Sequence, residues 1–372
     1  MSSRILFVGL DVDDQAFHGA ALERESGETG EFRCRATLKA LERSLVELAS
    51  RFPGREIRIC YEASYVGFHL QRDLARLGTF CEVISPSSVP RVRGNAVKTD
   101  RIDARKLAQF YANGQLKAVA PPDADVERDR DLLRSRQRLL HQLSQIRSHV
   151  HSLLRRQGIH YKAETGNKSH WTKHHLGWIE KKAQSLEGSL GLNLRLLLQQ
   201  MKWMDHTLGE YGRAIEELAK SPRYEKPVRA LLCYKGIKHI FAMTIATEIG
   251  NIARFDHPRS LASYMGLDIR EYSSGGKHHR LGITKQGNRY LRRAFVEANQ
   301  RGWAWGRVSR DLKNRREGAP PEWVAIADRC LNRLCKKGRR LLRAGKHPNK
   351  VKVACAREMV GFVWESLRAV AA

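Results

Sequence analysis

The sequence lacks the features that mark secreted and membrane proteins. Its seven cysteines are an odd number, and no two of them form a Cys-x-x-Cys pair. This argues against a disulfide framework and against a cysteine zinc site, and it fits a reducing cytoplasm. No run of about 18 apolar residues is present. The apolar stretch 5–10 is too short, and too closely followed by Asp11, Asp13 and Asp14, for a signal peptide. We therefore expect a soluble cytoplasmic protein.

Acidic residues are scarce relative to basic ones. The chain has 39 Asp and Glu against 67 Lys and Arg, a net charge of +28 with a pI of about 10.2. Hydrophobic residues make up 42% of the sequence, enough for folded cores. The excess of basic residues is concentrated in the C-terminal part of the chain. Residues 1–120 carry 18 basic and 15 acidic residues, whereas residues 270–350 carry 22 basic and 6 acidic residues. This predicts a polyanion-binding C-terminal surface, with nucleic acid as the expected partner and an anionic membrane surface as the alternative.

The first 120 residues show the pattern of an α/β domain. Apolar and β-branched runs predict strands, and leucines at helical spacing predict helices between them. The expected order is strands 5–12, 15–23 and 31–36, helix 37–51, strand 56–61, helix 65–77, strand 80–85 and helix 100–112. Such an order predicts a mixed sheet with helices on its faces.

Two leucine-rich heptad patterns follow a linker at 120–123. They run from Leu132 to Leu153 and from Leu190 to Leu218, and the polar stretch 157–189 joins them. We expect region 121–222 to form a coiled-coil linker, either as a helical hairpin or between chains. Two amphipathic helices packed on their own domain are an equal alternative. Region 223–372 is expected to be mostly helical.

Four acids of the first domain fall at positions suited to a shared site. Asp11 ends the first predicted strand, Glu62 follows another, and Asp100 and Asp103 share one face at the start of a helix. A ribonuclease-H-like fold gathers carboxylates in this way, and two Mg²⁺ ions would neutralise them and stabilise a phosphodiester displacement. Taken singly, each acid is better explained structurally: Asp100 as a helix N-cap, Asp103 as a charge near a helix start and Asp11 as a turn residue. Taken together with the strand order around them, the four acids favour a metal site.

A glycine–serine segment lies in the basic C-terminal region. Ser273 and Ser274 precede Gly275-Gly276, and cationic residues follow at once. An exposed serine amid cations suits attack on a phosphate, although the spacing alone favours a phosphate-binding loop in which the serines only donate hydrogen bonds. A helix–glycine turn–helix at 232–246 resembles hairpins that present backbone N–H groups to DNA. The predicted nucleic-acid contacts are Lys235, Lys277, Arg280, Lys285, Arg292 and Arg293.

Histidines gather in the polar stretch 157–189. They are His160, His170, His174 and His175, and no cysteine lies near them. Their neighbours are lysines, so we expect nucleic-acid contact or a solvated surface rather than a zinc site.

Several motifs together resemble the DEDD transposases of insertion-sequence family 110, which are related to the pilin-gene invertases. The motifs are Gly9-Leu10-Asp11, Tyr61-Glu62-Ala63, residues 98–105 (KTDRIDAR), residues 282–288 (GITKQGN) and Leu291-Arg292-Arg293. The resemblance covers nearly the whole chain. It implies a RuvC-like domain with its acidic tetrad at Asp11, Glu62, Asp100 and Asp103.

The same resemblance implies a serine nucleophile, at Ser274 with Ser273 as the adjacent alternative. It also implies donor and target DNA as substrates, a bridge RNA as guide, and homo-oligomers in which one subunit's acidic domain meets another's serine domain. Our primary hypothesis is therefore a DNA transposase or recombinase that uses Mg²⁺. The rivals are a metal-dependent nuclease in which water attacks, and a non-catalytic nucleic-acid-binding protein.

Overall fold

Residues 4–90, 99–274, 277–300 and 306–371 make up the described structure, a computed structural model; at 272–274 and 277–280 only the backbone is described. The chain divides into two units, residues 1–122 (unit 1) and residues 123–372 (unit 2). The sequence predicts a further boundary at 222/223, but both predicted segments on either side of it lie in unit 2.

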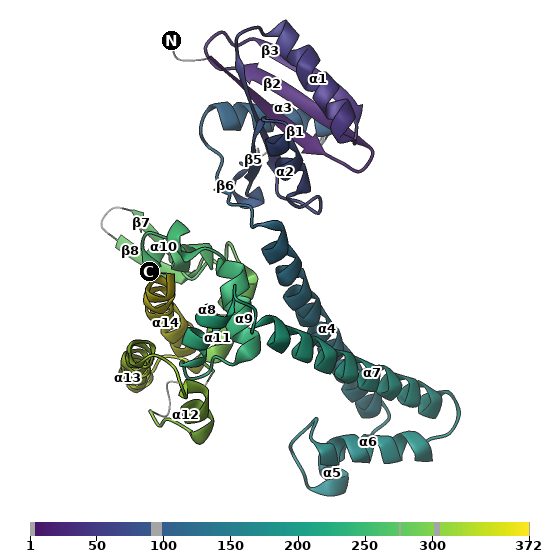
Figure 1. Cartoon of the computed structure of the whole chain (residues 1–372). Coiled ribbons are helices and arrows are strands. Elements are labelled where there is room, and N and C mark those ends of the chain that lie inside the picture. Colours follow the sequence, from purple (N-terminus) through teal and green to yellow (C-terminus); the bar gives the residue numbers. More distant parts are fainter. Residues whose placement is uncertain (1–3, 91–98, 275–276, 301–305, 372) are drawn as a thin grey trace. The chain divides into compact units, whose positions relative to one another are not determined.

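Unit 1 is a mixed six-stranded sheet with helices on both faces (Figure 1). The strand order is β3-β2-β1-β4-β5-β6; β1, β4 and β5 are parallel, and the other strands pair antiparallel. Of the six strands, only the short β6 was not predicted. The elements are β1 Ile5–Val12, β2 Ala16–Glu23, β3 Thr29–Arg35, α1 Leu38–Arg51, β4 Glu56–Glu62, α2 His69–Arg76, β5 Phe80–Ile84, η1 Pro86–Ser88, α3 Asp100–Ala112 and β6 Ala118–Val119.

Successive residues of β1 point alternately toward the two faces of this sheet. Leu6, Val8 and Leu10 are fully buried in the core formed with α1 and α2. Gly9 faces the other way, toward α3, because successive strand residues point to opposite faces. A Cβ on Gly9 would lie 2.4 Å from the backbone N of Ala108, so only glycine lets α3 pack this closely on β1.

Unit 2 is almost entirely helical, as predicted for the C-terminal part of the chain. Its elements are α4 Ala124–Arg156, α5 Tyr161–Thr165, α6 Lys173–Ser185, α7 Gly188–Leu218, α8 Glu225–Leu232, α9 His239–Ile249, η2 Ile252–Arg254, α10 Pro258–Tyr264, β7 Ile269–Ser274, β8 Lys277–Ile283, α11 Arg289–Ala298, α12 Arg310–Arg316, α13 Pro321–Arg343 and α14 Pro348–Ala371. The pair β7–β8, expected as a glycine-rich loop, is an antiparallel hairpin.

The two heptad patterns form a helical hairpin within the chain. Helices α4 and α7 pack along each other, and α6 packs against α7 (Figure 1). Their shared core contains Leu143, Val150, Leu194 and Met201, all buried. The stretch 157–189, expected only to be polar, contains α5 and α6, since Ile179 and Ala183 give α6 its own buried face. The hairpin alternative is therefore observed.

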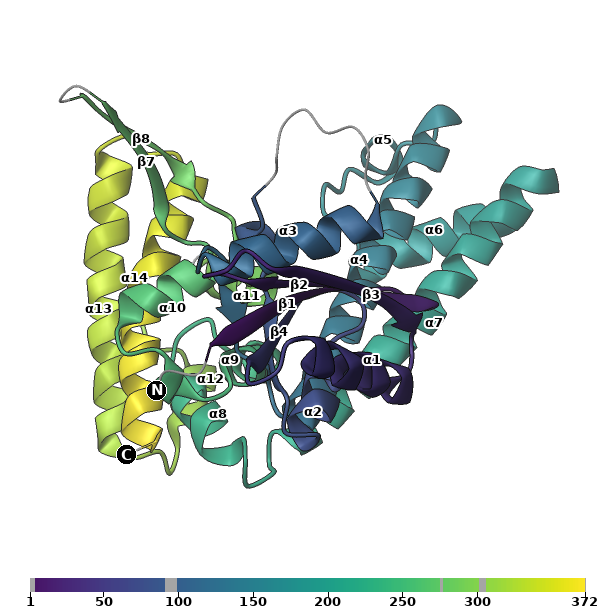
Figure 2. The same cartoon turned by 90° about the horizontal axis from the view of Figure 1, so that it is seen from above.

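The rest of unit 2 shares one apolar core. It joins α8, α9, α10, α11, α13 and α14, and α13 and α14 lie side by side (Figure 2). The predicted helix–turn–helix is α8–α9, with Gly236 at φ +88° in the turn. A Cβ there would lie 2.0 Å from the Ala298 carbonyl oxygen, so the glycine permits contact with α11. No described helix is long and apolar enough to span a bilayer.

Candidate active site

Asp11 and Glu62 lie on neighbouring strands at the same edge of the unit 1 sheet. In the parallel β1–β4 ladder Leu10 pairs with Tyr61, so the next residues along each strand, Asp11 and Glu62, lie opposite each other. Parallel strands lie about 4.8 Å apart. Asp11 is also paired with His18 on β2, so it belongs to the ladder and is not the turn residue considered from the sequence.

Both side chains are on the α3 face of the sheet. Asp11 lies two residues beyond Gly9, whose Cβ position meets α3. Glu62 lies two residues beyond Cys60, whose thiol contacts the Leu107 carbonyl oxygen of α3 at 4.0 Å. Because strand residues two apart share a face, the two carboxylates project toward the side on which α3 packs.

Helix α3 brings the other two acids to that face. Thr99 is its N-cap, accepting a hydrogen bond from the Ile102 N–H at 3.4 Å, so Asp100 is the first helical residue rather than the cap. Asp100 and Asp103 precede Ala104 and Leu107 by four residues each and extend the face that those two bury.

Glu31 on β3 fixes the start of this helix. Its carboxylate accepts a hydrogen bond from Arg101 at 2.6 Å and another from Arg105. These hydrogen bonds, that of Arg105 first, hold the pKa of Glu31 below its ordinary value. The pair of arginines thus anchors the first turns of α3 to the sheet edge.

Direct contacts support the common location of the acids. His18, opposite Asp11 on β2, has its Nδ1 3.5 Å from an Asp100 carboxylate oxygen. Asp103 accepts from Lys106 at 3.3 Å. Oxygen donors of this kind suit Mg²⁺. Among the described residues, however, no three of these carboxylates bring oxygens within 4.8 Å of one another. The acids share a face without forming a closed ligand set.

The serines lie on the β7–β8 hairpin of unit 2, which projects from its helices (Figure 2). In the backbone ladder Ser273 pairs with His278 and Ser274 with Lys277, at the end of β7. The side chains of Ser273, Ser274, Lys277 and Arg280 lie outside the described residues. Ser274 is the last residue of β7.

Backbone contacts fix the base of this hairpin. The Thr284 N–H donates to the Asp268 carbonyl at 2.8 Å, and the Asn288 N–H donates to the Tyr264 carbonyl at 2.8 Å. Gly266 and Gly287 both have positive φ, and a Cβ on either would clash with a carbonyl oxygen at 1.9 or 2.3 Å. The glycines therefore allow the GITKQGN segment to cross the end of α10 in contact with it.

The residues predicted to contact nucleic acid differ in their exposure and in the hydrogen bonds and ion pairs that they form within the chain. Lys285 is exposed. Arg292 donates to the Met265 carbonyl at 2.7 Å, and burial lowers its pKa. Arg293 pairs with Glu297 at 2.6 Å, and Lys235 donates to the Arg307 carbonyl at 3.1 Å. Arg292 in particular has a structural role that the sequence did not reveal.

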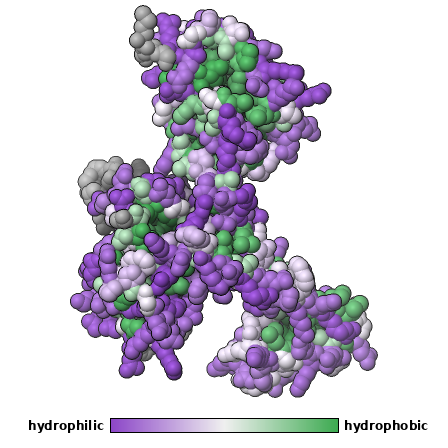
Figure 3. All heavy atoms as spheres, viewed as in Figure 1, coloured by the Kyte–Doolittle hydropathy of each residue, from purple (hydrophilic) through white to green (hydrophobic). Residues whose placement is uncertain are grey.

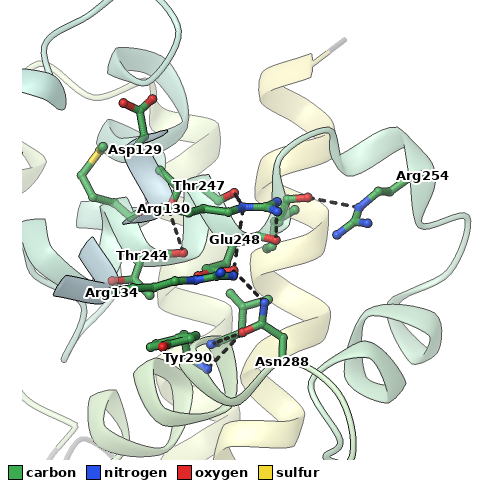
Figure 4. A network of polar contacts seen from close by, with 12 residues as sticks. Asp129, Arg130, Arg134, Thr244, Thr247, Glu248, Arg254, Asn288 and Tyr290 are labelled. Atoms are coloured by element: carbon green, nitrogen blue, oxygen red, sulfur yellow. Dashed lines mark hydrogen bonds and ion pairs between the residues drawn. The ribbon is translucent and has the colours of Figure 1, made fainter. Parts of the chain in front are cut away.

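A buried ionic network, not predicted from the sequence, joins α4, α9 and α11 (Figure 4). Its centre is Glu248, whose side chain is 1% exposed. Arg134 donates to both carboxylate oxygens at 2.7 and 2.8 Å, and Asn288 donates to one at 2.8 Å. Arg130 lies 3.8 Å away and donates to the Thr247 and Glu248 carbonyls. Burial alone would lower the pKa of Arg134, but its bonds to Glu248 raise it.

Asn288 links this network to the serine hairpin. Its side-chain oxygen accepts from the Tyr290 and Leu291 N–H groups and caps α11, while its amide nitrogen donates to Glu248. The residue that ends the GITKQGN segment is therefore bonded to α9, and through Glu248 it is linked to Arg134 of α4. Two sequence signals could have indicated this: Glu248 is the one acid in the apolar helix α9, and Arg130 and Arg134 are spaced i, i+4.

A cavity of about 240 Å³ adjoins the network between α4, α9 and α11. Three arginines line it, Arg134, Arg136 and Arg293, and burial followed by the charge of Arg293 lowers the pKa of Arg136. The Nε atom of Arg136 and the amide nitrogen of Gln137 are buried there without a hydrogen-bond partner among the described residues. Such donors suit an anionic group.

Figure 3 shows that hydrophilic residues cover most of the surface in this view.

The four histidines that the sequence places in the stretch 157–189 do not all lie together in the structure. His170 and His175 lie together, and His151 of α4, which was not considered, joins them. His174 instead bonds the Tyr161 hydroxyl through Nδ1 at 2.7 Å, and His160 precedes α5.

Comparison with known proteins gives consistent matches. Residues 8–158 match a family model described as "Transposase" (DEDD_Tnp_IS110), and residues 228–314 match one described as "Transposase IS116/IS110/IS902 family". A Sinorhizobium fredii (strain NBRC 101917 / NGR234) protein named as a transposase, y4qE, is 33% identical over 98% of this chain and 89% of its own.

Two further relatives carry similar names. The transposase for insertion sequence element IS1533 of Leptospira borgpetersenii is 27% identical over 91% of this chain and 97% of its own. The transposase for insertion sequence element IS1111A of Coxiella burnetii (strain RSA 493 / Nine Mile phase I) is 25% identical over 72% of this chain and 70% of its own.

Proposed function

The chain belongs to the IS116/IS110/IS902 family of insertion-sequence transposases, and on that premise we propose that it cuts and rejoins DNA with two separate groups of residues. The first group is the acidic tetrad Asp11, Glu62, Asp100 and Asp103 of unit 1. The second is the serine hairpin of unit 2. The observation that carries the proposal is that β1, β4 and α3 direct all four acids to one face at one sheet edge.

The tetrad is proposed to hold Mg²⁺. Carboxylate oxygens are the donors that this ion prefers, and the side chains of Asp100 and Asp103 are 61% and 26% exposed. When bound there, Mg²⁺ would polarise the scissile phosphodiester and stabilise its developing charge. Binding would have to bring the carboxylates closer together, because among the described residues no three of them have oxygens within 4.8 Å of one another.

Ser274 is proposed as the nucleophile. Its hydroxyl oxygen would form a bond to phosphorus, while the DNA sugar oxygen leaves with a proton, giving a phosphoserine link. A second DNA hydroxyl would then attack that phosphorus and release the serine. The support is the resemblance of its surroundings in sequence, the position at the end of β7, and the cationic residues across the hairpin. Ser273 is the alternative nucleophile.

The partners follow from the same premise. We propose donor and target DNA as substrates and a bridge RNA as guide, supported by the excess of 22 basic over 6 acidic residues in 270–350. We also propose a homo-oligomer, supported by exposed Leu192, Leu196 and Trp203 on α7, whose spacing of i, i+4 and i+11 puts them on one helix face. A cytoplasmic location is supported by seven free cysteines.

The experiment is an excision assay on a plasmid carrying the element, combined with trapping of protein–DNA adducts. Asp11→Asn and Asp103→Asn should abolish strand cleavage while circular dichroism stays that of the wild type. The control is Glu47→Gln, which removes one carboxylate from the exposed surface of α1, on the opposite face of the sheet. Full excision by both Asp variants would overturn the tetrad and favour a protein that only binds nucleic acid.

Ser274→Ala separates the two enzymatic mechanisms. It should abolish the covalent adduct and recombination. If cleavage persists with no adduct in the wild type either, water is the nucleophile and the chain is a metal-dependent nuclease. Ser273→Ala in the same assay distinguishes the adjacent serine.

A further inference from the structure

Three imidazoles meet at the far end of the α4–α7 hairpin. His151 lies near the C-terminal end of α4, His170 lies in the segment between α5 and α6, and His175 lies in the first turn of α6. One ring nitrogen of each is within 4.8 Å of the others. Within the described residues this is the one group of three His, Cys, Asp or Glu side chains that approach so closely.

The rings of these histidines are in direct contact. Their centroids are 4.5 Å apart for His151 and His170, 4.9 Å for His170 and His175, and 5.4 Å for His151 and His175. Aromatic packing alone could gather them, as Trp171 and Tyr161 also touch His175. The hydrogen bonding of His175 distinguishes aromatic packing from a site that binds a ligand.

His175 is 1% exposed, and one of its nitrogens has no partner. Its Nδ1 accepts a hydrogen bond from the Trp171 backbone N–H at 3.0 Å. Its Nε2 is buried and makes no hydrogen bond to any described residue. A buried polar atom without a partner is costly, and native proteins satisfy nearly all of them. Simple packing leaves this nitrogen unexplained, whereas a ligand would satisfy it.

The charge state of the rings suits metal binding. Neutral imidazole is the form that coordinates a cation, and a ring whose Nδ1 accepts a hydrogen bond, as that of His175 does, has no proton on that nitrogen.

We propose that His151, His170 and His175 bind one Zn²⁺ ion. Three imidazole ligands favour zinc over Mg²⁺ or Ca²⁺, which prefer oxygen. His170 is exposed, so the fourth position of a tetrahedral site would face solvent and take a water molecule. This site is separate from the acidic tetrad and does not rest on the proposed transposition chemistry.

Ligation through Nε2 of His175 has a definite proton requirement. The neutral ring now carries its proton on Nε2, because Nδ1 accepts from Trp171. Zinc at Nε2 moves that proton to Nδ1, and the Trp171 N–H must then leave its acceptor.

The consequence would be a bridge between three parts of the hairpin. His151 belongs to α4, whereas the other two ligands flank the start of α6. Zinc would attach the inserted segment 157–187 to the end of the long helix. This gives the insert a structural role beyond the nucleic-acid contact expected from its sequence.

The test is zinc titration of the metal-stripped full chain by calorimetry, with Co²⁺ absorption as a second readout. We expect one Zn²⁺ per chain and a visible Co²⁺ spectrum typical of tetrahedral coordination. His170→Ala should weaken binding by more than about tenfold, and His151→Ala likewise. Because His170 is exposed, its removal should leave the metal-free protein folded. The control is His149→Ala, an exposed residue of α4 two positions from His151, which should bind zinc normally.

Two results would overturn the proposal. One is the absence of stoichiometric zinc binding by the wild type. The other is binding that neither His170→Ala nor His151→Ala weakens, which would identify the ion as adventitious. In addition, nitrogen NMR of His175 should show the proton on Nε2 without metal and on Nδ1 with zinc, and an unchanged tautomer would also contradict the assigned ligand atom.

Discussion

Replacing Glu248 with alanine is the sharpest test of the buried network. The substitution removes the carboxylate that forms ion pairs with Arg130 and Arg134, and Arg130 is only 8% exposed. Removing one partner of a buried ion pair costs about 3–5 kcal/mol, because the remaining charge stays desolvated. For a unit of this size, about 2–4 °C of melting temperature corresponds to each kcal/mol, so we expect a decrease of about 6–20 °C.

Glu297→Ala is the matched control. Glu297 pairs with Arg293 within α11, and its side chain is 39% exposed. Exposed i, i+4 pairs contribute less than about 1 kcal/mol. The two variants therefore remove the same charge and the same type of partner, and they differ in burial. We expect the free energy of unfolding to fall at least three times as much for Glu248→Ala.

The assay is urea unfolding followed by tryptophan fluorescence. All seven tryptophans lie between residues 171 and 364, so the signal reports on unit 2 alone. Extrapolation to zero urea gives the free energy of unfolding, and an unchanged urea slope verifies that the same transition is compared. Equal losses in both variants, or a loss below about 1 kcal/mol for Glu248→Ala, would refute the reasoning.

Three further outcomes are expected. Gly9→Val should push α3 off β1, because backbone atoms of Ala104 and Ala108 lie 2.4–2.5 Å from the new Cβ. The substitution should destabilise unit 1 by about 1–3 kcal/mol or more and reduce cleavage. Normal hydrogen exchange in α3 would contradict this. The pKa of Glu31 is lowered in the folded protein, so its contribution to stability is present above its ordinary pKa of about 4.5 and is lost as the pH falls through the folded-state pKa. Wild type and Glu31→Gln should therefore differ in melting temperature at pH 7, and the difference should shrink as the pH is lowered; a constant difference would contradict the ion pair. Lys285→Ala should weaken DNA binding and reduce the slope of log affinity against log salt by about 1, and an unchanged slope would show that this exposed lysine touches no phosphate.

Much of unit 1 could be predicted because its signals are local. Alternation and leucine spacing located five of the six strands and all three α-helices within a few residues, and β6 was missed because two residues carry no periodicity. The four acids were grouped from strand order alone. Their common face became evident only from the pairing of Gly9 with α3, a contact between residues about 100 positions apart.

Unit 2 shows where sequence patterns are insufficient. The β7–β8 hairpin was expected as a loop because Ser, Gly and cationic residues dominate it, and its pairing depends on backbone contacts at 264–288. Glu248 and His151 were missed for a related reason. Each interacts with residues that are distant in the sequence, Glu248 with Arg134 of α4 and His151 with His170 and His175. Only tertiary structure identifies such residues.

The Asn288 side chain accepts hydrogen bonds through its oxygen and donates one through its amide nitrogen. This double role limits the residues that can replace it during evolution. Aspartate caps a helix as well as asparagine does, but here it would set a second carboxylate against Glu248. Serine and threonine have one short hydroxyl and cannot reach both the α11 amides and the buried acid. Of the ordinary capping residues only asparagine offers an acceptor and a donor on separate atoms. Drift at residue 288 should therefore be possible only after Glu248 itself has been lost.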